Sequence, residues 1–193
     1  MKTIIILDPA IVSNYSGYAP YEKLSAVDGN VHWPDDLPGI PADSKDTNNA
    51  LLGWVWPQGK VVFPDFFKNS TAEVWATLIA DYRNVLKFDG LWIDMNEPAC
   101  FGTNEEKPFN WPEHVRPYWS LKCPVSKYDD PPYRTGGSFF YDTASRRGRL
   151  SDKTICLSAV QGEHKEMRNY DVHNMYGYSQ IMATKVGLQR VRE

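Results

Sequence analysis

The sequence lacks any apolar run that approaches the roughly 20 residues of a membrane-spanning helix. It also lacks an excess of positive charge, because 21 basic and 24 acidic residues give a formal net charge of −3. No basic stripe or RNA-binding motif is present, so nothing indicates a nucleic-acid partner. The apolar stretch from Ile4 to Leu7 is too short for the core of a signal peptide. Any membrane attachment or targeting segment is therefore expected outside these residues.

Cysteine is scarce, and its pattern excludes the common metal motifs. Cys100, Cys123 and Cys156 do not have the spacing of a zinc finger or a redox motif, so we expect neither a metal site nor another cofactor. An odd number of cysteines allows one disulfide and one free thiol. Acceptor motifs for N-glycosylation begin at Asn14 and Asn69. Such motifs often arise by chance, but two of them mildly favour a protein of the secretory pathway.

The residues that are plentiful point to an ordinary globular domain. Hydrophobic residues make up 42% of the chain and charged residues 23%, which argues against disorder. Aromatic residues reach 13%, with seven Trp and eleven Tyr. Sugar-binding pockets use such rings, because the C–H faces of a sugar pack on flat aromatic surfaces. Aromatic residues also fill ordinary cores, so composition alone leaves both interpretations open.

Two short apolar runs are typical of buried strands in a parallel sheet. Residues 2–8 read KTIIILD and residues 90–94 read GLWID. Between them a helix is predicted to begin at Ser70 and to end before Asp89, because apolar side chains recur every three or four positions. Ser70 to Glu73 match a capping box at its start. Strand, crossover helix and strand predict a right-handed βαβ unit with parallel strands.

Most of the remaining chain is expected to be loop. Residues from about 13 to 62 are rich in Gly, Pro, Asn and Asp, which predicts long loops with short strands around Trp54 and Val61. Residues about 98–153 form a long loop that is typical of a functional segment or an insertion. Residues 154–160 predict a short strand, and residues from about 173 to 191 predict a helix. The fold class is therefore α/β. Because only two firm core strands are present and a (β/α)₈ barrel needs eight, we expect an incomplete part of a larger domain.

Asp94 and Glu97 are the distinctive candidates for chemistry. Asp94 falls at the C-terminal end of a predicted strand, and Glu97 follows in the same loop. An acid there can simply cap the next turn, and carboxylate oxygens also suit Ca²⁺ or Mg²⁺, although the spacing does not match an EF-hand. Trp92 and Met95 beside the acid favour a pocket for an organic ligand. A carboxylate between such walls can attack an anomeric carbon, as in a glycosidase.

Four ordered blocks of the sequence resemble glycoside hydrolase family 31, in particular its animal α-glucosidases. Residues 90–97 (GLWIDMNE) are similar to the nucleophile motif of that family, and residues 5–11 (IILDPAI) to its preceding barrel strand. Residues 55–66 contain VWP and FPDF, which resemble its next strand region. Residues 170–180 (YDVHNMYGYSQ) resemble the helix after the nucleophile loop. The resemblance implies that residues 1–193 form part of a (β/α)₈ TIM barrel.

The resemblance also implies roles for individual residues. Asp94 would be the nucleophile of a retaining α-glucosidase that removes terminal glucose from maltose-type oligosaccharides. Glu97 would orient its neighbours by hydrogen bonding. The wall of the glucose pocket would come from four side chains, Ile6, Trp56, Trp92 and Met95. Three further residues are interpreted as structural, Asp8 and Asp65 as acids at strand ends or turns and His173 as a helix-start or core histidine.

The same resemblance indicates which parts of the site lie elsewhere. In the family, the acid/base aspartate follows on a later segment, beyond Glu193. We therefore expect residues 1–193 alone neither to fold stably nor to turn over substrate, because retaining hydrolysis needs two carboxyl groups. The alternative from another class is a catalytically inactive homologue, or a truncated product, that serves as a carbohydrate-binding or interaction protein.

The resemblance further implies a disulfide between Cys123 and Cys156, since the intestinal enzymes pair a cysteine of the loop after the nucleophile with one near the following strand. Cys100 would then be the free thiol. This pairing and the acceptor motifs at Asn14 and Asn69 together predict the secretory pathway, in the extracellular space, at the cell surface or in the lysosomal lumen.

Overall fold

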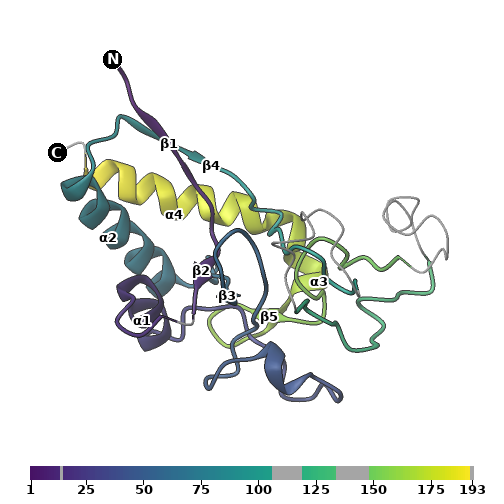
Figure 1. The fold of residues 1–193 in the computed structure, drawn as a ribbon. Coiled ribbons are helices and arrows are strands. Elements are labelled where there is room, and N and C mark those ends of the chain that lie inside the picture. The colour runs from purple at the N-terminus through teal and green to yellow at the C-terminus, as the bar shows by residue number, and fades with distance from the viewer. Residues whose placement is uncertain (14, 106–118, 134–147, 192–193) are drawn as a thin grey trace.

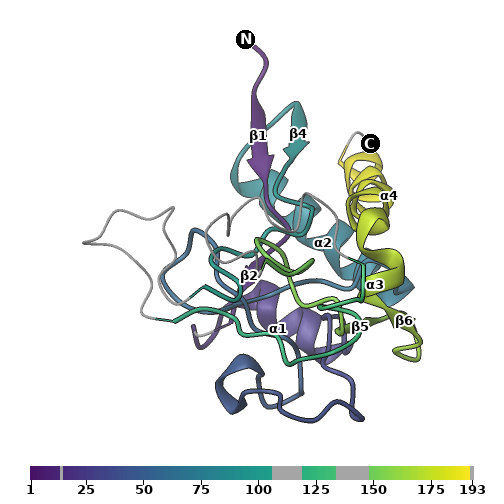
Figure 2. The ribbon, with the colours of Figure 1, turned by 90° about the vertical axis from the view of Figure 1, so that its right-hand side faces the viewer.

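A parallel pair of strands that are far apart in the sequence carries the fold. The computed structural model describes residues 1–13, 15–105, 119–133 and 148–191. Strand β1 (Ile4–Leu7) pairs in parallel with β4 (Gly90–Ile93). Figures 1 and 2 show the two strands side by side, with their chain directions alike. The two predicted strands and their parallel pairing are confirmed.

Two long helices pack against each other beside this pair. Helix α2 (Asn69–Val85) is the predicted crossover helix, and α4 (Tyr176–Arg190) lies alongside it (Figure 1). The Trp75 indole Nε1 donates to the Thr184 hydroxyl at 3.0 Å. A Cβ at Gly187 would lie 2.7 Å from the Cδ1 atom of Ile79. Glycine therefore lets the two helix backbones approach closely at this point.

The prediction of loops with short strands around Trp54 and Val61 in residues 13–62 missed helix α1 (Ala19–Ala26). The strand expected near Val61 is confirmed. Pro20 occupies the first turn, where its fixed φ suits a helix and no N–H is needed. Lys23 pairs with Asp81 of α2 at 2.9 Å, which joins the two helices. A short 3₁₀ helix, η1 (Ala42–Ser44), and the antiparallel strands β2 (Ile11–Val12) and β3 (Val61–Val62) complete this region.

The predicted capping box at the start of α2 is also wrong. The helix begins at Asn69, and its N-cap residue Lys68 makes no side-chain capping bond. Instead, the Asn69 N–H donates to the Glu163 carboxylate at 2.9 Å, so a distant acid satisfies the first free donor. Glu73 forms an ion pair with Arg190 of α4 rather than folding back on its own helix.

The C-terminal segment follows the predicted order with adjusted boundaries. The predicted strand at residues 154–160 survives only as β5 (Val160–Gln161), which pairs with β6 (Met167–Arg168) in an antiparallel hairpin. The predicted helix is divided into α3 (Asn169–Val172), the 3₁₀ helix η4 (His173–Met175) and α4. Within the described parts of residues 98–153 there is no helix or named strand, and residues 106–118 and 134–147 lie outside the described chain.

The disulfide inferred from the resemblance is present. The Cα atoms of Cys123 and Cys156 are 5.4 Å apart, and Cys100 is a buried free thiol. Of the two predicted glycosylation acceptors, Asn69 is exposed at the first residue of α2, whereas Asn14 lies outside the described residues.

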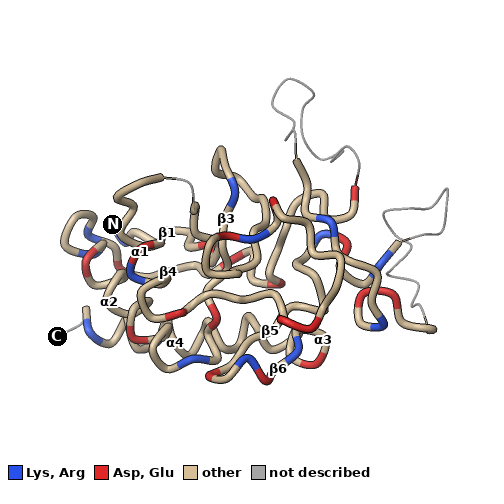
Figure 3. The backbone as a smooth tube through the Cα atoms, turned by 90° about the horizontal axis from the view of Figure 1, so that it is seen from below, with Lys and Arg blue, Asp and Glu red and all other residues tan. Residues whose placement is uncertain are grey.

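The hydrophobic core lies mainly beneath the loops that follow α1. Its largest fully buried side chains include Trp33, Phe63, Leu51 and Tyr176. The Trp33 indole donates to the Ser44 carbonyl at 2.8 Å, so this buried polar atom is satisfied. Acidic and basic residues are interspersed along the described backbone (Figure 3). Among the described helices, none combines the length and apolar character that crossing a membrane requires.

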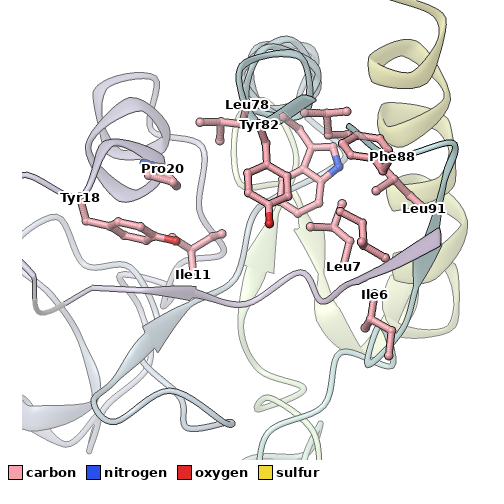
Figure 4. Close-up of a pocket in the computed structure, with 12 residues that line it drawn as sticks. Ile6, Leu7, Ile11, Tyr18, Pro20, Leu78, Tyr82, Phe88 and Leu91 are labelled. Carbon is pink, nitrogen blue, oxygen red and sulfur yellow. The ribbon is translucent and has the colours of Figure 1, made fainter. Parts of the chain in front are cut away.

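An apolar groove of about 320 Å³ remains open between β1, α1 and α2 (Figure 4). Figure 4 shows Leu7 and Tyr82 pointing toward it from the strand and from α2, and Tyr18 closing one end. A second groove on the far side of β4 is lined by Leu91, Ile93 and residues of α4. The helix-facing side of the strand pair is thus only partly covered in the described chain.

Candidate active site

The register of the strand pair brings two aspartates to the same sheet edge. Asp94 directly follows β4, and its N–H points to the Leu7 carbonyl of β1 at 3.4 Å. Ile6 lies opposite Trp92, so the residues two positions later, Asp8 and Asp94, continue on the same face. The carboxyl ends of parallel strands are where active sites form in α/β barrels. The sequence prediction for Asp94 therefore has the expected geometry.

This face also carries two of the predicted wall residues. Ile6 and Trp92 are each 56% exposed, although both are large and apolar. Their neighbours in the strands, Ile5 and Leu91, instead pack against the core. The alternation separates a covered face from an open one, and the open face presents apolar surface next to the carboxylate of Asp94.

A tight turn, residues 94–99, follows β4 and will be called the β4 turn. Met95 has φ = 54°, in the left-handed region that non-glycine residues rarely adopt. In this conformation the Met95 N–H donates to the Asp94 Oδ1 atom at 2.8 Å, and the Ala99 N–H closes the turn on the Met95 carbonyl at 3.0 Å. The turn thus holds one oxygen of the Asp94 carboxylate in a defined position.

The predicted wall residue Trp56 joins the site from a loop before β3. Its indole Nε1 donates to the Met95 sulfur at 2.9 Å. Its ring also meets Phe101 edge to face, with the ring centroids 4.7 Å apart. Trp56 nevertheless remains 63% exposed, so one face of the indole is available for contact. The structure therefore brings Trp56 into contact with Met95, the neighbour of Asp94, and their role in a glucose pocket stays a prediction.

Three acids give this end of the sheet a negative field. The pKa of Asp8 is raised, first by burial and then by the negative charges of Asp94 and Glu97. The Asp8 Oδ1 atom is buried and has no hydrogen-bond partner in the described chain. Sequence reasoning interpreted Asp8 as a structural acid and missed its place in this group. Its position opposite Asp94 depends on strand register, which only the paired strands reveal.

Glu97 also lies close enough to His173 for its charge to act on that ring. Burial lowers the pKa of His173, and the nearby Glu97 charge opposes that shift. The His173 Nε2 atom lies 2.8 Å from the Thr154 hydroxyl, and that hydroxyl lies 2.6 Å from the Pro98 carbonyl. His173 begins η4, so its interpretation as a helix-start residue agrees with the structure. Through the Thr154 hydroxyl, His173 is also linked to Pro98, which lies in the same turn as Glu97.

In the chain that the structure describes, one group of three side chains has the spacing of metal ligands, namely Cys123, Asp129 and Cys156. Its two sulfur atoms are bonded to each other, so they are not thiolate ligands in this state. The carboxylates of the β4 turn form no such convergent group. The observed arrangement around Asp94 is an acid beside apolar and aromatic walls, which suits an uncharged, hydroxyl-rich ring better than an ion.

Comparison with known proteins agrees with this geometry. Residues 1–193 match the TIM-barrel domain of the glycosyl hydrolases family 31. Intestinal sucrase-isomaltase from Homo sapiens is 37% identical over 205 residues, which cover 98% of this chain and 10% of that protein. Alpha-xylosidase 1 from Arabidopsis thaliana is 32% identical, with 100% of this chain and 19% of that protein covered.

The fold has counterparts among solved structures. The alpha subunit of glucosidase II in its Glc1Man2-bound form superposes with a TM-score of 0.57 at 21% identity, over 97% of this chain and 14% of that chain. The chain thus spans less than a fifth of the length of each of these proteins. With a family match along its entire length and relatives above 30% identity, the chain belongs to glycosyl hydrolase family 31, as part of the family's TIM-barrel domain.

Proposed function

We propose that the protein containing this chain is a retaining α-glucosidase with Asp94 as its nucleophile. The observation that carries the proposal is the placement of Asp94 at the carboxyl end of β4, with Trp92 and Met95 beside it and Trp56 in contact with Met95. The relatives support a glycosidase, since sucrase-isomaltase and alpha-xylosidase 1 are both named for cleaving glycosides.

The proposed reaction uses the Asp94 carboxylate twice. One carboxylate oxygen attacks the anomeric carbon of the terminal glucose, while the bond to the leaving oxygen breaks and that oxygen takes a proton from a separate acid. Water then attacks the anomeric carbon, and its proton passes to the acid that lost one in the first step. The bond to Asp94 breaks, which releases the sugar and the free carboxylate. The hydrogen bond from the Met95 N–H occupies Oδ1, so Oδ2 is the oxygen available for attack.

The pocket wall would hold the sugar by its apolar faces. Ile6 and Trp92 present exposed apolar surface on the same side of the strands as Asp94. The half-exposed Trp56 indole offers a flat ring on which sugar C–H groups can pack. Glu97 would act indirectly, through its charge near Asp8 and His173, and is proposed to orient its neighbours rather than to attack.

A second candidate substrate class is the α-xylosides. Alpha-xylosidase 1 is 32% identical to the chain, close to the identity of the glucosidase relatives. A glucoside differs from a xyloside by its hydroxymethyl group, so the residues that surround this group would decide between the two substrates. We favour α-glucosides because of the higher identity to sucrase-isomaltase, and propose the secretory pathway because a disulfide and the Asn69 acceptor are present.

The nucleophile is tested in the full-length protein with a mechanism-based fluorosugar or cyclitol epoxide. We expect covalent label on the peptide that contains Asp94 and none in Asp94→Asn. Asp81→Asn is the matched control, because Asp81 is an exposed acid on α2 that pairs with Lys23. Label that persists in Asp94→Asn contradicts the assignment.

The substrate class is tested by the ratio of kcat/KM for an aryl α-glucoside and an aryl α-xyloside. A ratio in favour of the glucoside supports the proposal, and the reverse supports the xylosidase. If the protein binds either sugar but neither hydrolyses it nor accepts label, the alternative of a catalytically inactive, carbohydrate-binding homologue replaces the proposed function.

A further inference from the structure

The β4 turn is tied to helix α4 by one pair of amide side chains. The Asn96 Nδ2 atom donates to the Gln180 Oε1 atom at 2.9 Å, between residues 84 positions apart. Gln180 is completely buried, so its side chain has a fixed surrounding and little freedom to follow a moving partner. Asn96 is two residues after Asp94 and lies in the same turn.

A glycine in α4 makes room for the Asn96 side chain. Gly177 lies one helical turn before Gln180, and a Cβ there would lie 3.2 Å from the Cγ and Oδ1 atoms of Asn96. That distance is shorter than an ordinary carbon contact, so only glycine lets the asparagine amide settle on the helix without displacement. Within the sequence YGYSQ, Gly177 thus leaves space for the Asn96 side chain and Gln180 accepts its hydrogen bond.

Hydrogen bonds to other segments hold the two ends of the β4 turn, and Asn96 lies between these ends. At the far end, the Thr154 hydroxyl donates to the Pro98 carbonyl at 2.6 Å. At the near end, the Asp94 N–H reaches the Leu7 carbonyl only at 3.4 Å, a long hydrogen bond. Between these ends, the Trp56 indole contacts the Met95 sulfur, and Asn96 connects the turn to helix α4.

We infer that Asn96 and Gln180 are positioning residues for Asp94. The inference rests on the proposed function, in which Asp94 attacks an anomeric carbon. The hydrogen bond holds the turn, the turn holds the left-handed Met95, and the Met95 N–H holds the Asp94 carboxylate. Since a displacement of about 1 Å at a reacting group can cost on the order of a hundredfold in rate, loss of this bond acts on the chemical step.

The chemistry of Gln180 separates this role from simple core packing. Its Oε1 atom accepts the Asn96 hydrogen, whereas its Nε2 atom is buried and donates to no partner in the described chain. A glutamate keeps an acceptor oxygen at the same place, whether it is ionised or protonated. A methionine keeps the volume but has no such oxygen. A positioning role therefore tolerates glutamate better than methionine, and a packing role tolerates methionine better than glutamate.

The test compares Gln180→Met and Gln180→Glu in the full-length protein, with an aryl α-glucoside as substrate. We expect Gln180→Met to lower kcat roughly 10- to 100-fold, with KM changed by less than about threefold, and to slow fluorosugar labelling in parallel. Gln180→Glu should restore most of kcat. Ser179→Ala is the control, because the neighbouring buried Ser179 hydroxyl bonds only within α4, to the Tyr176 carbonyl, and should leave kcat unchanged.

Each outcome decides the inference. Activity retained in Gln180→Met and lost in Gln180→Glu would show a packing residue and overturn the positioning role, even if Asp94 is labelled in the wild type. Equal kcat and labelling rates in all variants would overturn it as well. If the wild type carries no label on Asp94, the proposed function itself is wrong and the inference is withdrawn with it.

Discussion

At the scale of single residues, Met95 shows how the backbone prepares a carboxylate. Its φ of 54° is a conformation that costs a non-glycine residue about 1–3 kcal/mol and is kept where the surroundings enforce it. Here the enforcing contacts are the Trp56 indole on the Met95 sulfur and the Ala99 N–H on its carbonyl. In this conformation the Met95 N–H donates to the Asp94 carboxylate. The strained backbone of Met95 thus orders the side chain of the preceding residue, Asp94.

Asp65 carries a pH-dependent prediction for stability. It is buried and accepts N–H groups from Gly162 at 2.7 Å and Phe67 at 3.1 Å, and burial raises its pKa from 3.8 to about 7. Between these pH values the folded protein holds a proton that the unfolded chain releases. The contribution of Asp65 is therefore greatest below about pH 4 and is lost as the pH rises through about 7.

We expect Asp65→Asn to flatten the fall in the free energy of unfolding between about pH 4 and pH 7, by up to about 4 kcal/mol as an upper bound. Denaturant unfolding of both proteins across this range measures the difference. Asp81→Asn, at an exposed position, should leave the wild-type slope in place. The same slope in Asp65→Asn and the wild type would assign the pH dependence to other groups.

At the scale of secondary structure, patterns near in sequence were predictable and contacts between distant segments were not. The two apolar runs correctly predicted β1 and β4, and apolar periodicity predicted α2 and most of α4. Helix α1 was missed because its eight residues carry a weak apolar pattern, although Pro20 and Glu22 in its first turn are typical of a helix start. The capping box failed because Glu163, far along the chain, occupies that helix end.

The same distinction holds for the candidate site. Motif resemblance predicted roles for Asp94, Trp56 and Met95, and the structure shows Trp56 in contact with Met95 and the Met95 N–H on the Asp94 carboxylate. It did not identify Asp8 or the Asn96–Gln180 contact. These depend on strand register and on how a helix lies against a turn, neither of which a local pattern encodes.

Gly177 gives a prediction about an element rather than a side chain. Gly177→Ala should favour α4 by up to about 1 kcal/mol through helix propensity, while its Cβ pushes against the Asn96 amide at 3.2 Å. We expect a lower kcat with a melting temperature that is unchanged or higher. Steady-state kinetics and thermal unfolding of the same preparation measure both quantities.

Gly187→Ala is the matched control on the same helix. A Cβ there would lie 2.7 Å from Ile79 of α2, far from the β4 turn in sequence and in contact. It should lower the melting temperature and leave kcat per folded molecule nearly unchanged. Equal effects of the two variants on kcat would mean that α4 responds as a whole and that the contact with Asn96 is not special.

At the scale of the whole molecule, the strand pair is part of a barrel wall. One face of β1 and β4 packs toward α2 and α4, and the other carries Ile6, Trp92 and Asp94. In a (β/α)₈ barrel the first face meets the helices and the second lines the interior and its mouth. In the described chain, the two apolar grooves lie between this strand pair and the helices that cover its first face.

The disulfide acts at the same scale, because it closes 33 residues of the long loop after the β4 turn. In the chain-entropy model such a loop contributes roughly 3–4 kcal/mol. We expect Cys123→Ala to lower the thermal midpoint of the full-length protein. The double variant with Cys156→Ala should cost about as much as either single change, since the bond is lost in each. Fully additive losses would show that packing of the sulfur atoms, rather than the bond, is responsible.

The contacts around Asp94 share a property that bears on how the chain folds. Leu7 contacts Asp94, Thr154 contacts Pro98, and Asn96 contacts Gln180, so three of these contacts join segments that lie far apart in the sequence. Closing such long loops costs entropy before the contacts are gained, and it slows their formation, whereas helices such as α2 begin from local contacts. We therefore expect the arrangement around Asp94 to form later in folding than the helices do.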